Sequence, residues 1–562
     1  MVGYGMAGAR LVSEVHGRRP DLAVTVVGAE PYRAYNRILL SNLVAGRATE
    51  ADVYLAERIG PGGRIRLGVA AKAIDRDNRE VVTEDGERVP YDRLVLATGG
   101  RAALPPVPGL RRDDGRLADR VVAFRTLDDC RRVLALADAA VTVSSASALV
   151  LGGGLLGLEA ARGLAGRGLR VTVLHAVGHL MERQLDPAAG AMLAATLRGL
   201  GITVELNAVT SAVESTSDGV TAVLADGRRL AADLLVVACG IRPETGLATD
   251  AGLAVDRGIV VDEALRTSDP RIHAIGDCAQ YAGQLGGLVA PAWDQARVVA
   301  DLVTGVDPTA RYVPRPVVTR LKAAGIDLAA MGDSTADPAG DAVTFRDPRR
   351  GTYAKLVVRD DRLVGAILLG DNPLVGTVIQ TFDRGGPVPD PRALLLGRAS
   401  VGPGATEASP ALIPDATVIC QCNTVTKRAL VRCWQAGARS TAELMEATRA
   451  GTGCGTCRDA VDGIATWLSR AEGTNGGAPS EPVPAEEASA IPALVGTGPP
   501  VSNGTSARNG TSGSAGTFGS AGTFGSAGTF GSAGRPPSAG MPGSRVAPAG
   551  TGRQSRAKGS SA

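Results

Sequence analysis

The feature that most constrains the fold is a glycine-rich turn between two strand-like runs. An apolar run at residues 147–151 leads into Gly152, Gly154 and Gly157, and residues 169–175 read as a second strand. A helical pattern lies between them, so strand, turn, helix and strand fit within about 30 residues. The first glycine permits the tight turn, the second lets backbone amides approach a pyrophosphate, and the third lets helix and strand pack closely. The stretch therefore predicts a dinucleotide-binding unit rather than a bare glycine turn.

A second G-x-G-x-x-G pattern stands at the start of the chain. Gly3, Gly5 and Gly8 are followed by a helical pattern and by a strand-like run at residues 22–30, which ends on Glu30. An acidic side chain at about this distance typically binds a ribose 2′-hydroxyl. The alternative for Glu30 is an ordinary solvated carboxylate on a loop.

The strand that should precede this first turn is almost missing. Only Met1 and Val2 stand before Gly3, whereas a strand usually needs about five residues. Such a strand normally lies in the middle of its sheet. We therefore expect the native polypeptide to begin upstream of Met1, which N-terminal sequencing of the native protein tests.

Bulk properties exclude several classes of protein. At 562 residues the chain is too long for one core, and three or four domains are expected. With 60 basic and 57 acidic residues, nothing suggests a nucleic-acid partner. No signal peptide is visible, and eight cysteines without a secreted spacing favour a reducing, cytoplasmic location. Residues 139–158 are uncharged but rich in glycine and serine, so the glycine turn explains them better than a membrane span does.

Four cysteines form a cluster of two close pairs. Cys420 and Cys422 make a C-x-C pair, and after 31 intervening residues Cys454 and Cys457 make a C-x-x-C pair. Thiolates in this arrangement bind zinc or an iron–sulfur cluster, and the short C-x-C pair is unlike common zinc ribbons. Cys433 lies in a helical pattern, where core packing is the preferred interpretation.

Helical patterns accompany the cysteine pairs, and other segments have their own character. The helices are expected at residues 427–435, 441–449 and 459–470. Two β-rich runs at residues 353–359 and 363–370 predict a hairpin in a compact domain. Cys239 and Cys278 follow apolar runs, which favours buried thiols. The C-terminal residues are dominated by small and polar types and predict a flexible, disordered tail.

Taken together, these motifs resemble the two-dinucleotide-binding flavoproteins of the pyridine nucleotide–disulfide reductase superfamily. The resemblance rests on the two glycine turns about 150 residues apart and on residues 94–99 and 271–277. It implies an α/β fold with two Rossmann-like domains, the NAD domain inserted into the FAD domain. It also implies that the first turn and Glu30 hold FAD, with further contacts from Ala97, Thr98, Gly99, Gly276 and Asp277.

A narrower resemblance covers about residues 1–470. Residues 35–41, 152–160 and 180–186 resemble the flavoprotein half of NAD(P)H nitrite reductase large subunits and the electron-transfer subunit of assimilatory nitrate reductase. Residues 420–457 resemble the BFD-like [2Fe–2S] domain, an all-α module. The division implied is an FAD domain at 1–106 and 231–312, an NAD(P)H domain at 107–230, a small α+β domain at 313–396, a linker at 397–414, the [2Fe–2S] domain at 415–471 and the tail at 472–562.

The same resemblance assigns two catalytic candidates. Arg37 is expected near the isoalloxazine, where it supports an anionic reduced flavin; the alternative is an exposed loop arginine. Glu159 is expected to face the nicotinamide; the alternative is a carboxylate placed favourably at a helix N-terminus. The resemblance alone favours NADH over NADPH. The residues do not decide, because the second strand ends at His175 without an acid for the ribose, and Arg183, the nearest basic candidate for a 2′-phosphate, lies several residues further on. The small domain makes a homodimer an open expectation.

Two departures from the superfamily shape the functional prediction. No cysteine lies near residues 30–50, where disulfide reductases keep their redox thiols, and none follows Cys457. Disulfide reduction at the flavin is therefore not expected, and we do not expect this polypeptide itself to hold a sirohaem centre. We predict that electrons pass from NAD(P)H through FAD and the [2Fe–2S] cluster to a nitrate reductase catalytic subunit, or secondly to a nitrite reductase.

Two other functions remain open from the sequence. One is a general ferredoxin- or rubredoxin-type reductase that serves an oxygenase. The other is a redox-sensing or Fe–S-handling adaptor without enzymatic activity. A relaxed choice of acceptor would favour the first, and negligible NAD(P)H oxidation by loaded protein would favour the second.

Overall fold

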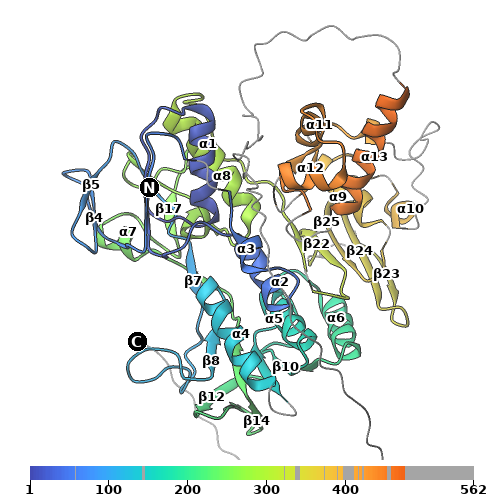
Figure 1. The fold of residues 1–562 in the computed structure, drawn as a ribbon. Helices are drawn as coiled ribbons and strands as arrows, with labels where there is room; N and C mark the ends of the chain where they lie inside the picture. The colour runs from blue at the N-terminus through green and yellow to red at the C-terminus, as the bar shows by residue number, and fades with distance from the viewer. Residues whose placement is uncertain are drawn as a thin grey trace, which may run out of the picture. The chain divides into compact units, whose positions relative to one another are not determined.

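The computed structural model describes most of the chain up to residue 474 (Figure 1). The described residues are 1–56, 59–141, 146–321, 323–335, 342–372, 374–388, 390–395, 410–415, 417–420, 423, 425–451 and 457–474. Most of the predicted linker and tail therefore lies outside the described residues. Among the helices of these ranges, none has the length and apolar character needed to cross a membrane.

The first glycine turn sits in a parallel sheet whose central strand is reduced to one residue. Val2 makes parallel bridges with Val27 on one side and Leu96 on the other. Its backbone is fully used, because Val2 N donates to Val95 O at 2.9 Å and Ala97 N donates to Val2 O at 2.7 Å. The outer pairs are β1 (Thr25–Gly28) with β2 (Arg64–Leu67), and β6 (Leu94–Leu96) with β18 (Ile272–Ala274). The expected position of this strand in the middle of its sheet is confirmed.

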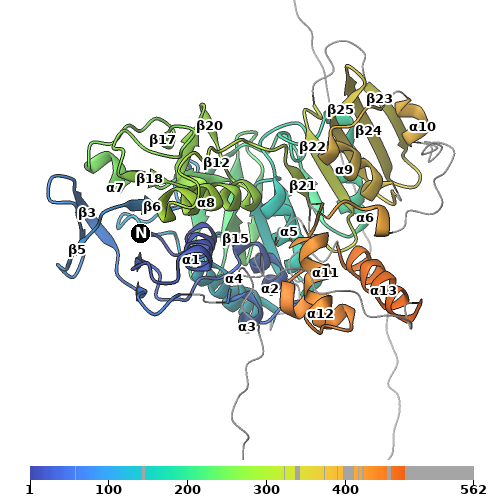
Figure 2. The same ribbon diagram turned by 90° about the horizontal axis from the view of Figure 1, so that it is seen from above.

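Two helices cover one face of this sheet. The helices α1 (Met6–Arg18) and α8 (Val289–Thr304) lie side by side in Figures 1 and 2. Leu11 and Val15 of α1 and Val299 of α8 are buried in one core with the strands. The helix predicted behind the first glycine turn is confirmed. Its apolar residues recur at the spacing that places them on one face of a helix.

Shorter elements complete the part of the chain that surrounds the first turn. Those before residue 130 are η1 (Arg37–Leu39), α2 (Leu40–Val44), α3 (Glu50–Val53), β3 (Ala71–Asp75), β4 (Glu80–Thr83), β5 (Arg88–Pro90) and β7 (Gly100–Ala102). Those after residue 240 are β16 (Ile241–Pro243), α7 (Gly246–Asp250), β17 (Ile259–Val261), η2 (Gly276–Cys278), β19 (Ala279–Tyr281) and β20 (Gln284–Leu285). The strands β7 and β16 pair antiparallel, so the chain leaves and re-enters this region through one two-stranded ribbon.

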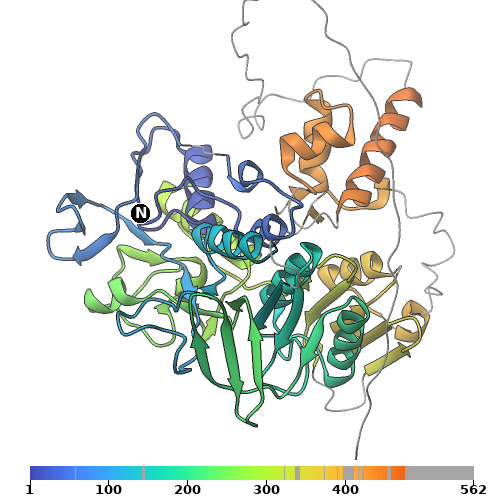
Figure 3. The ribbon, with the colours of Figure 1, turned by 60° about the horizontal axis from the view of Figure 1, so that its bottom comes forward.

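The second glycine turn belongs to a five-stranded parallel sheet of order β11-β10-β9-β15-β8. Its strands are β8 (Val121–Ala123), β9 (Ser147–Leu151), β10 (Arg170–Leu174), β11 (Thr203–Glu205) and β15 (Leu234–Val237). Its helices are α4 (Leu127–Val141), α5 (Leu155–Gly166) and α6 (Pro187–Gly199). An antiparallel sheet of β12 (Thr210–Ser215), β13 (Val220–Leu224) and β14 (Arg229–Ala232), green in Figure 3, is inserted before the last strand.

The position of β15 differs from the expected domain boundary at residue 230. All four residues of β15 are buried, and the strand pairs with β9 and β8. A short fully apolar run does not reveal which of two adjacent sheets it joins, because either interior would bury it. The nucleotide-binding sheet therefore continues to Val237.

The segment after α8 forms an antiparallel sheet of order β21-β22-β25-β24-β23. Its elements are β21 (Val318–Arg320), β22 (Leu328–Gly332), β23 (Ala342–Asp347), β24 (Thr352–Arg359), β25 (Arg362–Leu369), α9 (Val375–Arg384) and α10 (Pro391–Leu395). The predicted hairpin is confirmed as β24 and β25, joined through Asp360 (φ 49°) and Asp361 (φ 55°). Aspartate tolerates this left-handed conformation better than most side chains do, which suits a tight hairpin turn.

The last described region is a small helical unit with a two-stranded ribbon. It consists of η3 (Pro410–Leu412), β26 (Val418–Cys420), β27 (Val425–Thr426), α11 (Lys427–Gln435), α12 (Thr441–Thr448) and α13 (Arg458–Thr474). Thr426 and Ser440 cap the first two helices by accepting backbone N–H bonds. All three predicted helices are confirmed.

A buried histidine on β18 predicts an acid-sensitive fold. His273 is 4% exposed, and burial, with help from Arg93 and Arg266, lowers its pKa to about 4. Its ordinary value is 6.5, so the unfolded chain takes up the proton first. The neutral imidazole of His273 therefore contributes about 3 kcal/mol to the free energy of unfolding. This contribution is fully present above pH 6.5 and is lost as the pH falls towards 4.

We therefore expect His273→Leu to make the free energy of unfolding less dependent on pH in the acidic range. Between about pH 7 and about pH 4, the native protein should lose roughly 3 kcal/mol more of its free energy of unfolding than the variant loses. Urea denaturation of both proteins at the two pH values measures the difference. Parallel losses in the two proteins would contradict the role of His273.

Candidate functional site

The first glycine turn has two crowded positions and one open one. A Cβ on Gly3, whose φ is +100°, would overlap the carbonyl oxygen of Ala97, and a Cβ on Gly8 would overlap the carbonyl oxygen of Gly3. Gly5 is the N-cap of α1 and has no atom within 4 Å of a Cβ position. Gly5, Met6 and Ala7 at the start of α1 line an open cavity, so the unpaired backbone N–H groups of this helix end can bind an anion such as a pyrophosphate.

The second glycine turn repeats this geometry. Gly152, with φ +120°, approaches Ala238 too closely for any side chain, and Gly157 approaches Gly152 in the same way. Gly154 is the N-cap of α5 and again has no atom within 4 Å of a Cβ position. Each turn thus fits a dinucleotide pyrophosphate, because the close packing of strand and helix leaves the middle glycine exposed to a ligand.

A cavity of about 1020 Å³ adjoins the first turn and reaches the start of α5. This volume is at the upper end of the range for cofactor and small-molecule sites. The predicted site residues that line it are Gly3, Gly5, Glu30, Arg37, Ala97, Thr98, Gly99, Glu159, Gly276 and Asp277. The structure therefore brings together residues that are up to 274 positions apart, the span from Gly3 to Asp277.

Glu30 follows the end of β1 and is held by two side chains. Arg37 forms an ion pair with one of its oxygens, and Tyr35 Oη donates to the other at 2.6 Å. Burial raises the pKa of Tyr35, and Glu30 adds to the effect, so the phenol keeps the proton that it donates. Arg37 also donates to Arg125 O at 3.3 Å. The sequence did not identify Tyr35 as a partner of Glu30.

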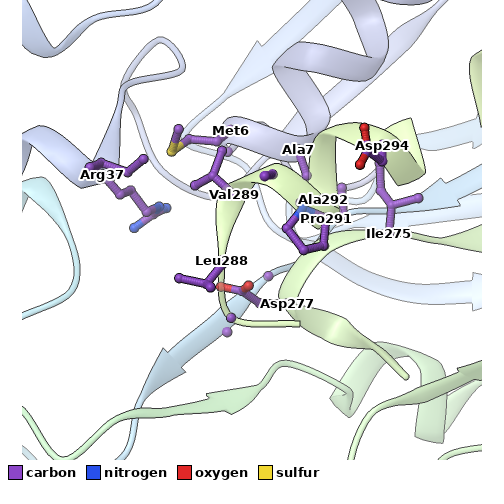
Figure 4. Close-up of a pocket in the computed structure, with 18 of the residues that line it drawn as sticks. Met6, Ala7, Arg37, Ile275, Asp277, Leu288, Val289, Pro291, Ala292 and Asp294 are labelled. Carbon is purple, nitrogen blue, oxygen red and sulfur yellow. The ribbon is translucent and has the colours of Figure 1, made fainter. Parts of the chain in front are cut away.

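Asp277 lies on η2, where a second arginine orients it. Arg125 Nη2 and Asp277 Oδ2 are 2.5 Å apart, and Arg125 Nε donates to Gly100 O at 3.2 Å. Figure 4 shows Asp277 beside Leu288, with Arg37 reaching into the pocket from another side. Gly276 N donates to Gln295 Oε1 at 2.7 Å, which fixes the turn before Asp277. No sequence motif marked Arg125 or Gln295.

Glu159 lies one turn into α5 and lines the cavity from the side of the second glycine turn. It is 7% exposed, which is unusual for a carboxylate. The structure therefore places the Glu159 side chain on the cavity wall, and its position beyond the first turn of α5 disfavours the alternative of a carboxylate held by the helix N-terminus.

Two of the four clustered cysteines are described, and they share one apolar core. Cys420 ends β26 and is 1% exposed, and Cys457 precedes α13 and is 7% exposed. Both pack in a cluster that includes Leu430 and Trp434 of α11. Cys422 and Cys454 lie outside the described residues. The two distant ends of the cysteine motif are therefore brought to the same place.

The remaining cysteines behave differently from one another. Cys278 is fully buried, as expected. Cys433 is half-buried on α11 and packs against the core of that unit. The expectation of burial is wrong for Cys239 as a residue, which is exposed because β15 ends at Val237 and the chain leaves the sheet there, but its Sγ donates to Leu151 O at 3.3 Å and burial raises the pKa of the thiol to about 11.

Family models match three segments of the chain. The pyridine nucleotide-disulphide oxidoreductase model matches residues 1–296, the C-terminal domain of rubredoxin NAD⁺ reductase matches residues 317–379, and the BFD-like [2Fe–2S] binding domain matches residues 418–466. These matches correspond to the two glycine turns, the antiparallel sheet and the cysteine-bearing unit.

Individual relatives agree with the family models. The chain is 34% identical to nitrite reductase [NAD(P)H] of Bacillus subtilis (strain 168) over 83% of this chain and 57% of the relative. It is 33% identical to the assimilatory nitrate reductase electron transfer subunit of the same organism over 84% and 60%. The chain thus spans less than two thirds of either relative.

A solved structure shows the same architecture. The chain matches the covalent putidaredoxin reductase–putidaredoxin complex with a TM-score of 0.62 and 27% identity, over 70% of this chain and 94% of that chain. The resident cofactors are FAD and a [2Fe–2S] cluster, and NAD(P)H is the electron donor. The chain belongs to the pyridine nucleotide-disulphide oxidoreductase family and is an NAD(P)H-dependent flavoprotein oxidoreductase.

Proposed function

We propose that this chain oxidises NAD(P)H and delivers electrons to the catalytic subunit of a nitrate reductase, with a nitrite reductase as the second candidate. The observation that carries the proposal is the presence, in one chain, of two dinucleotide cradles and a BFD-like unit with paired cysteines. FAD held at the first glycine turn would supply hydride acceptance and one-electron chemistry, and a [2Fe–2S] cluster held by the cysteine pairs would supply one-electron transfer to the partner. The names of the relatives at 34% and 33% identity support the choice of partner.

Within this proposal, the first turn holds FAD. Gly3 and Gly8 keep sheet and helix close together, and the open space at Gly5 lets the N–H groups of α1 bind the pyrophosphate. Glu30 accepts hydrogen bonds from a ribose. Arg37 and Tyr35 support this role by fixing both carboxylate oxygens of Glu30.

The other cavity residues are proposed to hold the flavin end of the cofactor. Ala97, Thr98 and Gly99 close one wall, and Gly276 and Asp277 contact the ribityl chain; their position on the cavity wall supports both roles. Arg125 positions the carboxylate of Asp277.

Arg37 and Glu159 stay the two catalytic candidates. Both line the cavity. The ion pair with Glu30 also supports a binding role for Arg37 at the ribose and phosphate part of FAD. The burial of Glu159 beside the start of α5 supports a position facing the nicotinamide.

The second turn is proposed to hold NAD(P)H through Gly152, Gly154 and Gly157. We expect Gly157→Ala to raise the KM for NAD(P)H about 10- to 100-fold, because overpacking against backbone shifts the turn that binds the pyrophosphate. FAD content should be unchanged. Steady-state kinetics and the flavin spectrum of purified protein measure both quantities.

Gly166→Ala is the matched control on the same helix. A Cβ at Gly166 meets no atom within 4 Å, so its KM should equal that of the native protein. Equal KM values for the two variants would contradict a pyrophosphate site at this turn.

The [2Fe–2S] cluster is proposed to be ligated by Cys420, Cys422, Cys454 and Cys457. The support is the shared core of Cys420 and Cys457 together with the match of residues 418–466 to the BFD-like model. Thiolate ligands need a reducing compartment, so we propose a cytoplasmic location. We also propose that the protein forms a homodimer, which light scattering tests. The proposed domain division is the one given above, with the NAD(P)H domain extended to Val237.

The experiment that tests the proposed function is anaerobic reduction of reconstituted protein. NADH or NADPH should bleach the flavin absorbance, a reduced-cluster EPR signal should follow, and adding a nitrate reductase catalytic subunit with nitrate should reoxidise both centres. Bleaching without any reoxidation by nitrate or nitrite reductase would overturn the choice of partner. Failure to bleach would overturn the electron-transfer activity itself.

A second candidate function is a ferredoxin- or rubredoxin-type reductase for an oxygenase. It is favoured by the match of residues 317–379 to the rubredoxin NAD⁺ reductase C-terminal domain and by the likeness to putidaredoxin reductase. Fast reoxidation by a ferredoxin or rubredoxin, with none by nitrate reductase, would select it. A non-enzymatic adaptor is set aside because the chain belongs to an oxidoreductase family.

A further inference from the structure

The residue that follows strand β10 is a histidine whose ring is enclosed by protein. At this position dinucleotide domains that use NADH place an acidic side chain for the adenosine ribose. His175 is 7% exposed, so most of its ring is enclosed by protein. The contact to the ribose has to come from another side chain if this domain makes one.

Both ring nitrogens of His175 contact atoms of the protein backbone. Gly153 N donates to Nδ1 at 3.1 Å, and Nε2 lies 2.9 Å from His179 O. These partners assign the proton to Nε2 of a neutral ring. A Cβ on Gly153 would collide with the ring of His175 and with Leu180. His175 is therefore a positioning residue that forms the wall of the glycine turn.

A short segment after β10 is tied to that same turn. Met181 N donates to Gly153 O at 3.0 Å, so Gly153 is bonded through its N–H to His175 and through its carbonyl to Met181. Met181 is 1% exposed and has φ +52°, a left-handed conformation that a methionine rarely adopts. The chain is thus bent sharply at a buried, bonded residue immediately before Glu182.

This bend places a carboxylate at the end of β10. Glu182 Oε2 is 3.3 Å from Nε2 of His175, and the Glu182 side chain is 40% exposed. Its carboxylate therefore lies beside the side chain that stands at the sequence position of the missing acid, and it is accessible to a ligand at the edge of the glycine turn. Arg183, the next residue, is exposed to solvent.

We infer that Glu182 supplies the acidic contact to the adenosine ribose hydroxyls and makes this domain selective for NADH over NADPH. The inference rests on the proposed NAD(P)H site at the second glycine turn. A carboxylate accepts hydrogen bonds from both hydroxyls of an unmodified ribose, whereas a 2′-phosphate brings negative charge against it. Specificity then comes from one side chain that both attracts NADH and repels NADPH.

The test compares Glu182→Gln with the neighbouring Arg183→Gln. Stopped-flow reduction of the flavin gives kcat/KM for NADH and NADPH, and calorimetry gives the dissociation constants of NAD⁺ and NADP⁺. Glu182→Gln should lower kcat/KM for NADH about 10- to 100-fold, the effect of losing hydrogen bonds to a charged group. It should weaken NAD⁺ binding by a similar factor and leave NADP⁺ binding equal or tighter.

Arg183→Gln should leave the NADH preference unchanged. The inference is overturned if Glu182→Gln leaves the preference unchanged, or if Arg183→Gln selectively weakens NADP⁺ binding in a protein that prefers NADPH. The proposed function fails separately, when neither nucleotide bleaches the flavin of the native protein. Because Glu182 is 40% exposed, its replacement by an amide of the same shape leaves the fold intact.

Discussion

Replacing Gly8 with alanine is expected to weaken FAD binding about 10- to 100-fold, the result of overpacking a site that has no room. The new Cβ would overlap the carbonyl oxygen of Gly3, and both groups belong to the backbone. No rotamer change can relieve the overlap, so α1 has to move away from the strand that holds Val2. That movement shifts the N–H groups proposed to bind the pyrophosphate.

The measurement is the FAD dissociation constant of deflavinated protein, followed by flavin fluorescence. Gly17→Ala is the matched control, because Gly17 lies on the same helix and a Cβ there meets no atom within 4 Å. Alanine is a better helix former than glycine by about 1 kcal/mol, so this control should bind FAD normally and melt no earlier. Equal FAD affinity in the two variants would contradict the assignment of the first turn to FAD.

The second large effect is expected at the cysteine-bearing unit. Cys457→Ser should abolish the absorbance and EPR signal of the [2Fe–2S] cluster, because a serine hydroxyl does not supply the thiolate that the cluster needs. Reduction of the flavin by NAD(P)H should continue at the native rate. Electron delivery to the partner reductase should fall by more than about 100-fold, beyond the loss usual for residues that only support a metal ligand.

Cys433→Ser is the matched control within the same unit. Cys433 lies on α11 and contacts the core that contains Cys457, yet it is outside the two cysteine pairs. It should keep the cluster signal and electron delivery. Loss of the cluster in Cys433→Ser, with retention in Cys457→Ser, would reassign the ligands.

Local patterns in the chain predicted much of the site. The G-x-G-x-x-G spacing predicted the turn at Gly3, Gly5 and Gly8, where the structure leaves no room for a side chain on Gly3 or Gly8 and leaves space at Gly5. The helices α11, α12 and α13 agree with their predicted ranges for a similar reason. A polar cap followed by apolar residues at helical spacing is a local signal.

Side-chain partners were not predictable in this way. Arg125 and Asp277 are 152 residues apart in the chain, and no spacing rule connects them. Tyr35 and Glu30 are only 5 residues apart, yet their hydrogen bond depends on how the chain turns after β1.

The sequence by itself determined the two glycine turns, the cysteine pairs and the helices around them, because these depend on backbone conformation over short distances. Only the tertiary structure decided that Val2 alone serves as the central strand and that β15 closes the second sheet. It also decided that Glu182 stands beside His175 at the end of β10. The first two depend on which distant segments share a sheet, and the third depends on how the short segment after β10 turns at Met181. Packing, rather than residue spacing, decides each of them.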